Sequence, residues 1–226
     1  MTGTLGRPRL HLRATTSTND RARALAAAGA PHGTLVTTGH QTAGRGRQGR
    51  TWSAPPGTAL LCSLVLREHD PLLPLRAGLA VADVAGPDAR VKWPNDVLLG
   101  GRKVAGILVE ARAAEGWAVL GIGVNVALDP DALPAEVRAR AATLGRGPED
   151  VERTLDELLA RLAVRLDEPA DAALEALRAR DALRDAPVRW SGGAGTGAGI
   201  DDAGALLVRL DGGSVRRLEA GEVHLG

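Results

Sequence analysis

Two stretches in the middle of the chain decide its fold: VLLGGRKVAGILVE at residues 97–110 and WAVLGIGVNV at residues 117–126. Both consist of short apolar runs that match the length of strands rather than helices. The Gly100-Gly101 pair divides the first stretch and predicts a tight hairpin turn. A further turn is expected between the two stretches. Consecutive strands joined by turns predict a largely antiparallel sheet rather than alternating strand–helix–strand units.

Elements on both sides extend this sheet and cover it. Further strands are expected at residues 8–13, 34–38, 58–67 and 91–93, and helices at residues 21–28, 72–84, 155–166 and 172–183. Residues 39–57 form a long loop rich in glycine, arginine and proline, and loops of this length are usually functional or disordered. The predicted fold class is therefore α+β, with a mixed, largely antiparallel central sheet and flanking helices.

The pattern changes beyond Pro187 to short strands separated by turns. Strands are expected at residues 188–190, 205–210, 214–218 and 222–225, with residues 192–199 and 211–213 as turns or loops. These strands predict a small all-β domain of about 40 residues, which needs packing on a larger body because so short a chain buries little surface. We therefore expect two domains, at residues 1–184 and 185–226.

Composition limits what the protein can do. The 226 residues are 44% hydrophobic and 24% charged, which is typical of a folded globular protein. A net charge of +1 argues against binding to DNA or membranes through bulk charge. No apolar run approaches the roughly 20 residues of a membrane helix, and residues 1–13 lack the apolar stretch of a signal peptide. We therefore expect a cytoplasmic protein with no membrane partner.

The side chains give little support for a metal site. A single cysteine, Cys62, excludes an internal disulfide and a zinc site built from several thiolates. The five histidines, including His69, do not follow a metal-ligand spacing. We therefore expect no metal held by protein side chains.

The loop Gly-Arg-Gly-Arg-Gln-Gly-Arg at residues 44–50 is the first candidate site. Its three glycines let the backbone approach a ligand closely. Its three arginines repel one another, and an anion such as a polyphosphate would offset that repulsion through charge-assisted contacts. From these residues alone, a solvated loop or an RNA-binding tract is an equally good interpretation.

The turn Lys92-Trp93-Pro94-Asn95-Asp96 and the strand residue Lys103 are further candidates. Asn95 has the groups to bind a base or ribose, and Asp96 has the charge to hold a cation, although an ordinary Asx turn also explains the pair. Lys103 and Lys92 are the only lysines beside 26 arginines. A lysine is a compact point charge that a planar guanidinium does not replace. A solvated lysine at the end of a strand is the alternative for Lys103.

Small residues mark the two strands of the opening stretches. Gly106 on one strand, and Gly121 and Gly123 on the next, leave room for a flat ligand, and Asn125 supplies a polar group at the end of that slot. A twisted strand with bulges is the alternative.

The run Ser17-Thr18-Asn19 precedes a predicted helix and offers three polar side chains suited to a urea or a carbonyl group. Gln41 can join it from the long loop. An ordinary helix cap is the alternative for this run.

Together these motifs resemble the biotin protein ligases in order and spacing. The matching segments are Ser17-Thr18-Asn19, residues 41–52 (QTAGRGRQGRTW), residues 92–96 (KWPND), residues 103–110 (KVAGILVE) and residues 121–125 (GIGVN). The resemblance spans residues 17–125, and the small β domain fits it as well. It implies a catalytic domain of the biotin–lipoyl ligase type, similar to class II synthetases, followed by an SH3-like C-terminal domain.

The resemblance implies a two-step reaction. Biotin and ATP, with Mg²⁺, give biotinyl-5′-adenylate and pyrophosphate, and a lysine of a biotin carboxyl carrier protein then attacks the adenylate. The implied biotin-binding residues are Ser17, Thr18, Asn19, Gln41, Gly44, Arg45, Gly46, Arg47, Lys103, Gly106 and Gly123. The implied ATP-binding residues are Arg45, Arg47, Arg50, Trp52, Asn95, Lys103 and Asn125. The implied catalytic residues are Lys103, Arg45, Arg47 and Asp96, with Asp96 orienting the acceptor lysine.

The sequence departs from the family pattern at two positions. Gln48 stands where many members carry another arginine, and Leu61 lies in a strand where some members place an aromatic residue. The effect of both on retention of the adenylate is open. Too few residues precede Ser17 for the helix-turn-helix of some members, so the resemblance implies the monofunctional form without DNA binding. Some members pair through a sheet edge, which makes a homodimer an expectation.

Three other functions stay open. A lipoate or octanoate ligase shares the catalytic fold, although the Gly-Arg loop favours biotin. A non-catalytic RNA-binding module could use that loop, but the chain has no Phe or Tyr for a stacking platform. A biotin-binding relative without turnover is the third.

Overall fold

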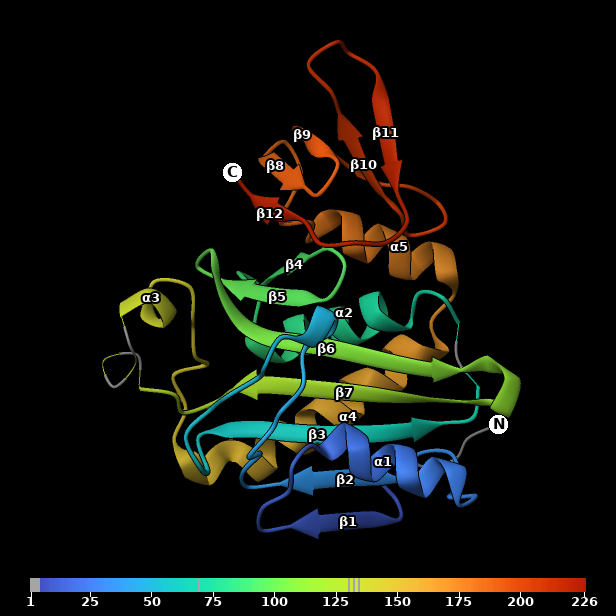
Figure 1. Cartoon of the computed structure of the whole chain (residues 1–226), viewed down its shortest axis with the longest axis vertical. Coiled ribbons are helices and arrows are strands. Elements are labelled where there is room, and N and C mark those ends of the chain that lie inside the picture. The colour runs from blue at the N-terminus through green and yellow to red at the C-terminus, as the bar shows by residue number, and fades with distance from the viewer. Residues whose placement is uncertain (1–4, 69, 130, 132, 134) are drawn as a thin grey trace.

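The computed structural model describes residues 5–68, 70–129, 131, 133 and 135–226, and arranges them around two β-sheets (Figure 1). The larger sheet has seven strands in the order β1-β2-β3-β7-β6-β5-β4. Their bounds are β1 Arg9–Leu12, β2 Leu35–Thr38, β3 Ala59–Leu66, β4 Arg90–Lys92, β5 Asp96–Leu99, β6 Arg102–Arg112 and β7 Trp117–Asn125. Only β1 and β2 pair in parallel; the other neighbours are antiparallel. The predicted α+β class with a mixed, largely antiparallel sheet is confirmed.

The inner strand β3 is buried along its whole length because helices cover both faces of the sheet (Figure 1). One face packs against α2 (Leu73–Ala85) and α4 (Val151–Asp167), and the other against α1 (Thr18–Ala27). Successive side chains along β3 point to opposite faces of the sheet. Leu64 therefore packs in the large core under α2 and α4, while Val65 packs in a smaller core with α1.

The helices form where the apolar spacing predicts them, with differences at their ends. The helices α1 and α4 begin three and four residues before the expected starts at residues 21 and 155. In α4, Leu155, Leu158 and Leu162 form a buried stripe at helical spacing. The helix predicted at residues 172–183 is α5 (Ala170–Ala179), which begins after Pro169 and ends four residues earlier than expected. It ends there because the chain then runs beside β4, where the Val91 N–H donates to the Arg180 carbonyl at 2.8 Å. A short helix, α3 (Ala135–Arg138), lies in the connection after β7.

The smaller sheet has five antiparallel strands in the order β11-β10-β9-β8-β12. Their bounds are β8 Pro187–Trp190, β9 Gly193–Ile200, β10 Leu206–Arg209, β11 Val215–Leu218 and β12 His224–Leu225. The expectation of turns or loops at residues 192–199 is wrong for residues 193–199, because β9 occupies them. Its glycines permit close packing rather than turning: a Cβ on Gly195 would lie 2.5 Å from the Arg209 carbonyl oxygen, and one on Gly197 would overlap the Leu183 carbonyl.

The smaller sheet packs against the body of the larger one. The buried indole N–H of Trp93, next to β4, donates to the Gly204 carbonyl at 3.0 Å. The Arg178 guanidinium on α5 donates to the Ile200 carbonyl at 2.8 Å. Among the helices of the described residues, none is long and apolar enough to cross a membrane.

Candidate functional site

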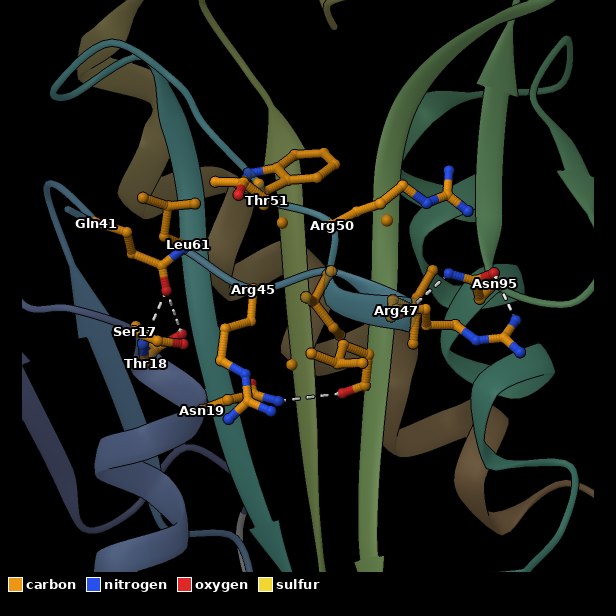
Figure 2. Close-up of a pocket in the computed structure, with 18 of the residues that line it drawn as sticks. Ser17, Thr18, Asn19, Gln41, Arg45, Arg47, Arg50, Thr51, Leu61 and Asn95 are labelled. Atoms are coloured by element: carbon orange, nitrogen blue, oxygen red, sulfur yellow. Dashed lines mark hydrogen bonds between the residues drawn. The ribbon is translucent and has the colours of Figure 1, made fainter. Parts of the chain in front are cut away.

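A cavity of about 160 Å³ opens on the β3–β7–β6 face of the larger sheet, beneath the arginine-rich loop (Figure 2). Every predicted site residue except Gly44 and Asn125 lines it. The sequence motifs therefore come together at one place, although their members lie up to about a hundred residues apart. The cavity has a floor, a polar end and a cationic rim.

Glycines form the floor. Gly106 on β6 and Gly123 on β7 are paired in register, so two neighbouring positions lack side chains. The indole of Trp52 lies close above them: a Cβ on Gly123 would be 2.6 Å from Trp52 Cε2, and one on Gly106 would be 3.0 Å from Trp52 Cζ3. The slot is therefore flat, as predicted, and an aromatic ring fits against it. The aliphatic Leu61 pairs with Gly123 and forms part of the wall.

The polar end is built at the start of α1. Gln41 Oε1 accepts from the Thr18 backbone N–H at 2.8 Å and lies 3.1 Å from the Thr18 hydroxyl. Ser17 occupies the N-cap position, but its side chain makes no capping hydrogen bond. Because the cap interpretation does not account for this hydroxyl, Ser17 can serve a ligand.

Buried Ser63 on β3 extends the polar end under the floor. Its hydroxyl oxygen lies 2.8 Å from Thr18 Oγ1 and 2.6 Å from Asn19 Oδ1. Sequence reasoning missed this residue, although a serine inside an otherwise apolar strand was a usable signal. Gly121 makes room for the arrangement, because a Cβ there would overlap the Asn19 side chain.

The arginine loop forms the rim and is held by ion pairs and hydrogen bonds. It contains one turn of 3₁₀ helix at Arg47–Gly49, in which Gln48 takes a left-handed conformation with φ 55°. Arg45 Nη1 lies 2.9 Å from Asp20 Oδ1. Arg50 pairs with Glu222, next to β12 in the smaller sheet. The C-terminal strands therefore reach the loop directly, a contact for which the sequence carries no local signal.

Arg47 connects the loop to the Lys-Trp-Pro-Asn-Asp turn. Its guanidinium donates to Asn95 Oδ1 at 3.0 Å (Figure 2) and to the Gly221 carbonyl at 3.1 Å. Asn95 Nδ2 in turn donates to the Ile107 carbonyl at 3.0 Å. Burial lowers the pKa of Arg47 from its ordinary value, but a guanidinium remains charged. Arg47 is thus a fixed cation facing the slot.

Both lysines of the chain flank one carboxylate. Lys103 Nζ lies 2.6 Å from Asp96 Oδ1, and Lys92 Nζ lies 4.0 Å from Asp96 Oδ2. Burial lowers the pKa of Lys92, with a smaller opposing effect from Asp96. Lys103 Nζ also lies 5.4 Å from the centre of the Trp52 ring, within cation–π distance. The cationic charge is therefore concentrated at the end of the slot opposite Gln41.

Two predicted site residues do not line the cavity and instead hold or accommodate the segments around it. Asn125 is buried, and its amide donates to the Ala142 carbonyl at 2.9 Å, so it fixes the segment after α3 rather than closing the slot. Gly44 lies beneath the loop, where a Cβ would be 2.7 Å from Gln41 Nε2 and would overlap the Trp52 carbonyl. It permits the approach of Trp52 and Gln41.

Within the part of the chain that the structure describes, no three His, Cys, Asp or Glu side chains gather as a metal site. His69 lies outside the described residues. Asp96 is the one carboxylate among the described residues that line the cavity, and it pairs with Lys103.

Comparisons with known proteins agree with this geometry. The family model of the Biotin/lipoate A/B protein ligase family matches residues 12–127, and that of the Biotin protein ligase C terminal domain matches residues 195–226. The Biotin--[acetyl-CoA-carboxylase] ligase of Mycobacterium tuberculosis is 37% identical over 93% of this chain and 86% of the relative. Its counterpart from Paracoccus denitrificans is 38% identical over 94% of this chain and 98% of the relative.

The Bifunctional ligase/repressor BirA of Bacillus subtilis is 40% identical over 61% of this chain, and the match spans 46% of BirA, about half its length. Among solved structures, the Aquifex aeolicus biotin protein ligase in complex with biotin and ATP has a TM-score of 0.84 and 26% identity. That match covers 97% of this chain and 100% of the other. The similarity therefore includes both sheets.

Proposed function

Because this chain belongs to the biotin/lipoate A/B protein ligase family, we propose that it is a biotin protein ligase, which activates biotin with ATP and transfers it to a lysine of a biotin carboxyl carrier protein. The observation that carries the proposal is the cavity itself: a flat glycine floor runs from a polar end at Thr18 and Gln41 to a cationic end at Arg47 and Lys103. Biotin has the matching shape, with a flat ureido ring at one end and a carboxylate at the other.

The ureido ring would lie at the start of α1. Ser17, Thr18, Asn19 and Gln41 offer donors and acceptors for the ureido carbonyl and N–H groups, and Gly106 and Gly123 let the ring lie flat on the sheet. The indole of Trp52, which rests on the same glycines, would have to shift to admit the ring. Gly44, Arg45 and Gly46 would shape the loop that closes over it.

Activation brings two anions together. A biotin carboxylate oxygen bonds to the α-phosphorus of ATP, the bond from that phosphorus to the bridging oxygen breaks, and pyrophosphate leaves. Lys103 and Arg47 at the end of the slot would stabilise the charge that builds up at this point. Mg²⁺ would enter on the nucleotide phosphates, since the cavity offers no cluster of carboxylates to hold it.

The nucleotide would be held by several of the same groups. Arg45, Arg47, Arg50 and Lys103 supply cations for the phosphates, and Trp52 an aromatic face for the adenine. Asn95 and Asn125 already bond to neighbouring carbonyls, and we propose that they shape the nucleotide site through those contacts.

Transfer requires an amine. The acceptor lysine nitrogen attacks the acyl carbon of biotinyl-5′-adenylate, AMP leaves, and the amine loses a proton. Asp96, whose carboxylate lies 2.6 Å from Lys103 Nζ, is suited to orient the incoming neutral amine by accepting one of its N–H groups.

The same framework supports proposals for organisation and partners. Residues 1–184 would form the catalytic domain and residues 185–226 the C-terminal domain, whose sheet begins at Pro187. The acceptor would be the carrier domain of a biotin-dependent carboxylase, in the cytoplasm where ATP and carrier occur together. β1 is an edge strand of the larger sheet and offers an unpaired edge for a homodimer.

Transfer to a carrier domain tests the proposal. The enzyme, ATP and Mg²⁺ are incubated with a biotin carboxyl carrier domain and with biotin, lipoate, octanoate or no acid, and the carrier mass is measured. We expect biotin alone to be attached, and a carrier whose target lysine is replaced by arginine to stay unmodified. Attachment of lipoate or octanoate in place of biotin would contradict the proposal.

A further inference from the structure

We propose that Glu110 is a positioning residue for biotin activation, which holds Arg45 of the arginine loop and Asn19 of the polar end in one geometry. The proposal rests on the biotin ligase function proposed above and extends it. Glu110 lies on β6, two residues before the end of the strand and four after Gly106 of the slot floor. It does not line the cavity, so it would act through residues that do.

The Glu110 carboxylate contacts two elements at once. Oε2 accepts from Asn19 Nδ2 at 2.8 Å, on α1. Oε1 lies 3.1 Å from Arg45 Nη2, on the loop. Figure 2 shows the Arg45 side chain extending from the loop toward Asn19. A glutamate placed only for solubility near a strand end would project into water, whereas this side chain is only 20% exposed and uses both oxygens.

Charge alternates around Arg45. Asp20 on α1 lies 2.9 Å from Arg45 Nη1, whereas Glu110 contacts Nη2. Arg23 contacts both carboxylates, Asp20 at 2.5 Å and Glu110 at 3.5 Å. The hydrogen bond to Asp20, and after it the charge of Glu110, raise the pKa of Arg45. Two carboxylates and two guanidinium groups therefore fix the direction of Arg45 against the repulsion of the other loop arginines.

The contact to Asn19 continues into the polar end. Asn19 Oδ1 can only accept, so it takes the proton of the Ser63 hydroxyl, 2.6 Å away. The Ser63 oxygen also lies 2.8 Å from Thr18 Oγ1, and the Thr18 hydroxyl donates to Gln41 Oε1 at 3.1 Å. Glu110 therefore also fixes which way the Asn19 amide faces, because only the Nδ2 end can donate to a carboxylate. Loss of the carboxylate would free both the amide and the loop arginine.

Calorimetric titration of biotin into the full chain without ATP, followed by biotin-dependent pyrophosphate exchange, tests this role. Glu110→Gln keeps the volume but removes the charge. We expect its Kd for biotin to rise about 10- to 100-fold, the effect of losing one charge-assisted hydrogen bond. The KM for biotin should rise in parallel, and the KM for ATP should rise as well because Arg45 is also proposed to bind the phosphates, while the urea midpoint stays near that of the wild type. A merely structural role would lower the midpoint.

The matched control is Glu115→Gln, since Glu115 is exposed and its side chain forms no hydrogen bond or ion pair within the described residues. It should bind biotin like the wild type. A Glu110→Gln variant that binds biotin within twofold of the wild type would overturn the positioning role while leaving the ligase function intact. A wild type that neither binds biotin nor exchanges pyrophosphate would instead refute the ligase function. Should Glu110→Gln not fold, Glu110→Asp decides in the same way, because its shorter carboxylate cannot reach both partners.

Discussion

Replacing Gly123 with alanine places one methyl group on the floor of the slot. Its Cβ would lie 2.6 Å from Trp52 Cε2 and 2.8 Å from Trp52 Nε1, which is closer than nonbonded atoms tolerate. Trp52 belongs to a surface loop, so its indole can move away without unfolding the sheet. A biotin ring bound on the floor would clash with the same methyl group, because the closely spaced neighbouring strands leave that group no room to move aside.

The magnitude follows from the cost of overpacking, about 1–3 kcal/mol for an added methyl group in a tightly packed place. Applied to biotin binding, this cost weakens Kd about 5- to 140-fold. The free energy of unfolding should fall by no more than about 1 kcal/mol, the low end of the same range, because the indole yields. Gly106→Ala should have a smaller effect on Kd, since its Cβ would lie 3.0 Å from Trp52 Cζ3.

The assay is calorimetric titration of biotin, with urea unfolding in parallel. Gly212→Ala is the control, because a Cβ at Gly212 meets nothing within 4 Å. The expected order of biotin affinity is wild type and Gly212→Ala, then Gly106→Ala, then Gly123→Ala. Unchanged affinity in a folded Gly123→Ala variant would refute the placement of biotin on this floor.

Three further predictions concern single side chains. Lys103→Ala should reduce the rate of biotin-dependent pyrophosphate exchange about 10²- to 10³-fold without loss of the fold. Lys103→Arg should not restore the rate, because a planar guanidinium does not replace the point charge of lysine. Exchange at the wild-type rate by either variant would show that Lys103 takes no part in the reaction. Burial raises the pKa of Cys62 to about 12, so the thiol stays protonated at pH 8 and a thiol reagent should label it only after unfolding in urea; fast labelling of the native protein would contradict this. The hydrogen bond from Arg9 lowers the pKa of Glu152. The pair therefore contributes fully to the free energy of unfolding above the ordinary glutamate pKa of 4.5, and this contribution is lost as the pH falls through the lowered pKa. Because Glu152 is 61% exposed, the contribution should be below about 1 kcal/mol, seen as a urea-stability difference between wild type and Glu152→Gln at pH 7 that vanishes in acid.

The strands and helices of the larger sheet could be predicted because their apolar spacing is local. The spacing of Leu155, Leu158 and Leu162, within eight residues of sequence, predicts the buried face of α4. The same local reasoning failed at β9, where Gly195 and Gly197 suggest turns. Those glycines allow close packing against a neighbouring strand and against Leu183, and the local sequence pattern contains no information on either contact.

The candidate site was predictable in its motifs and not in its contacts. Lys103, Asp96 and Arg47 belong to recognisable segments, and the structure gathers them at one cavity. The partners of Arg45 and Asn19 were not predictable, because Glu110 lies 91 residues from Asn19 in the sequence. Asn125 shows the opposite case: its motif suggested a ligand contact, whereas its amide binds the Ala142 carbonyl.

Pyrophosphate exchange into ATP is the decisive measurement for biotin activation, since it reports adenylate formation without needing a carrier protein. The measurement is run with biotin, with lipoate and with neither acid. We predict exchange that requires biotin, with no more than background from lipoate. Exchange driven by lipoate, or none with either acid, would contradict the assignment of this cavity to biotin activation.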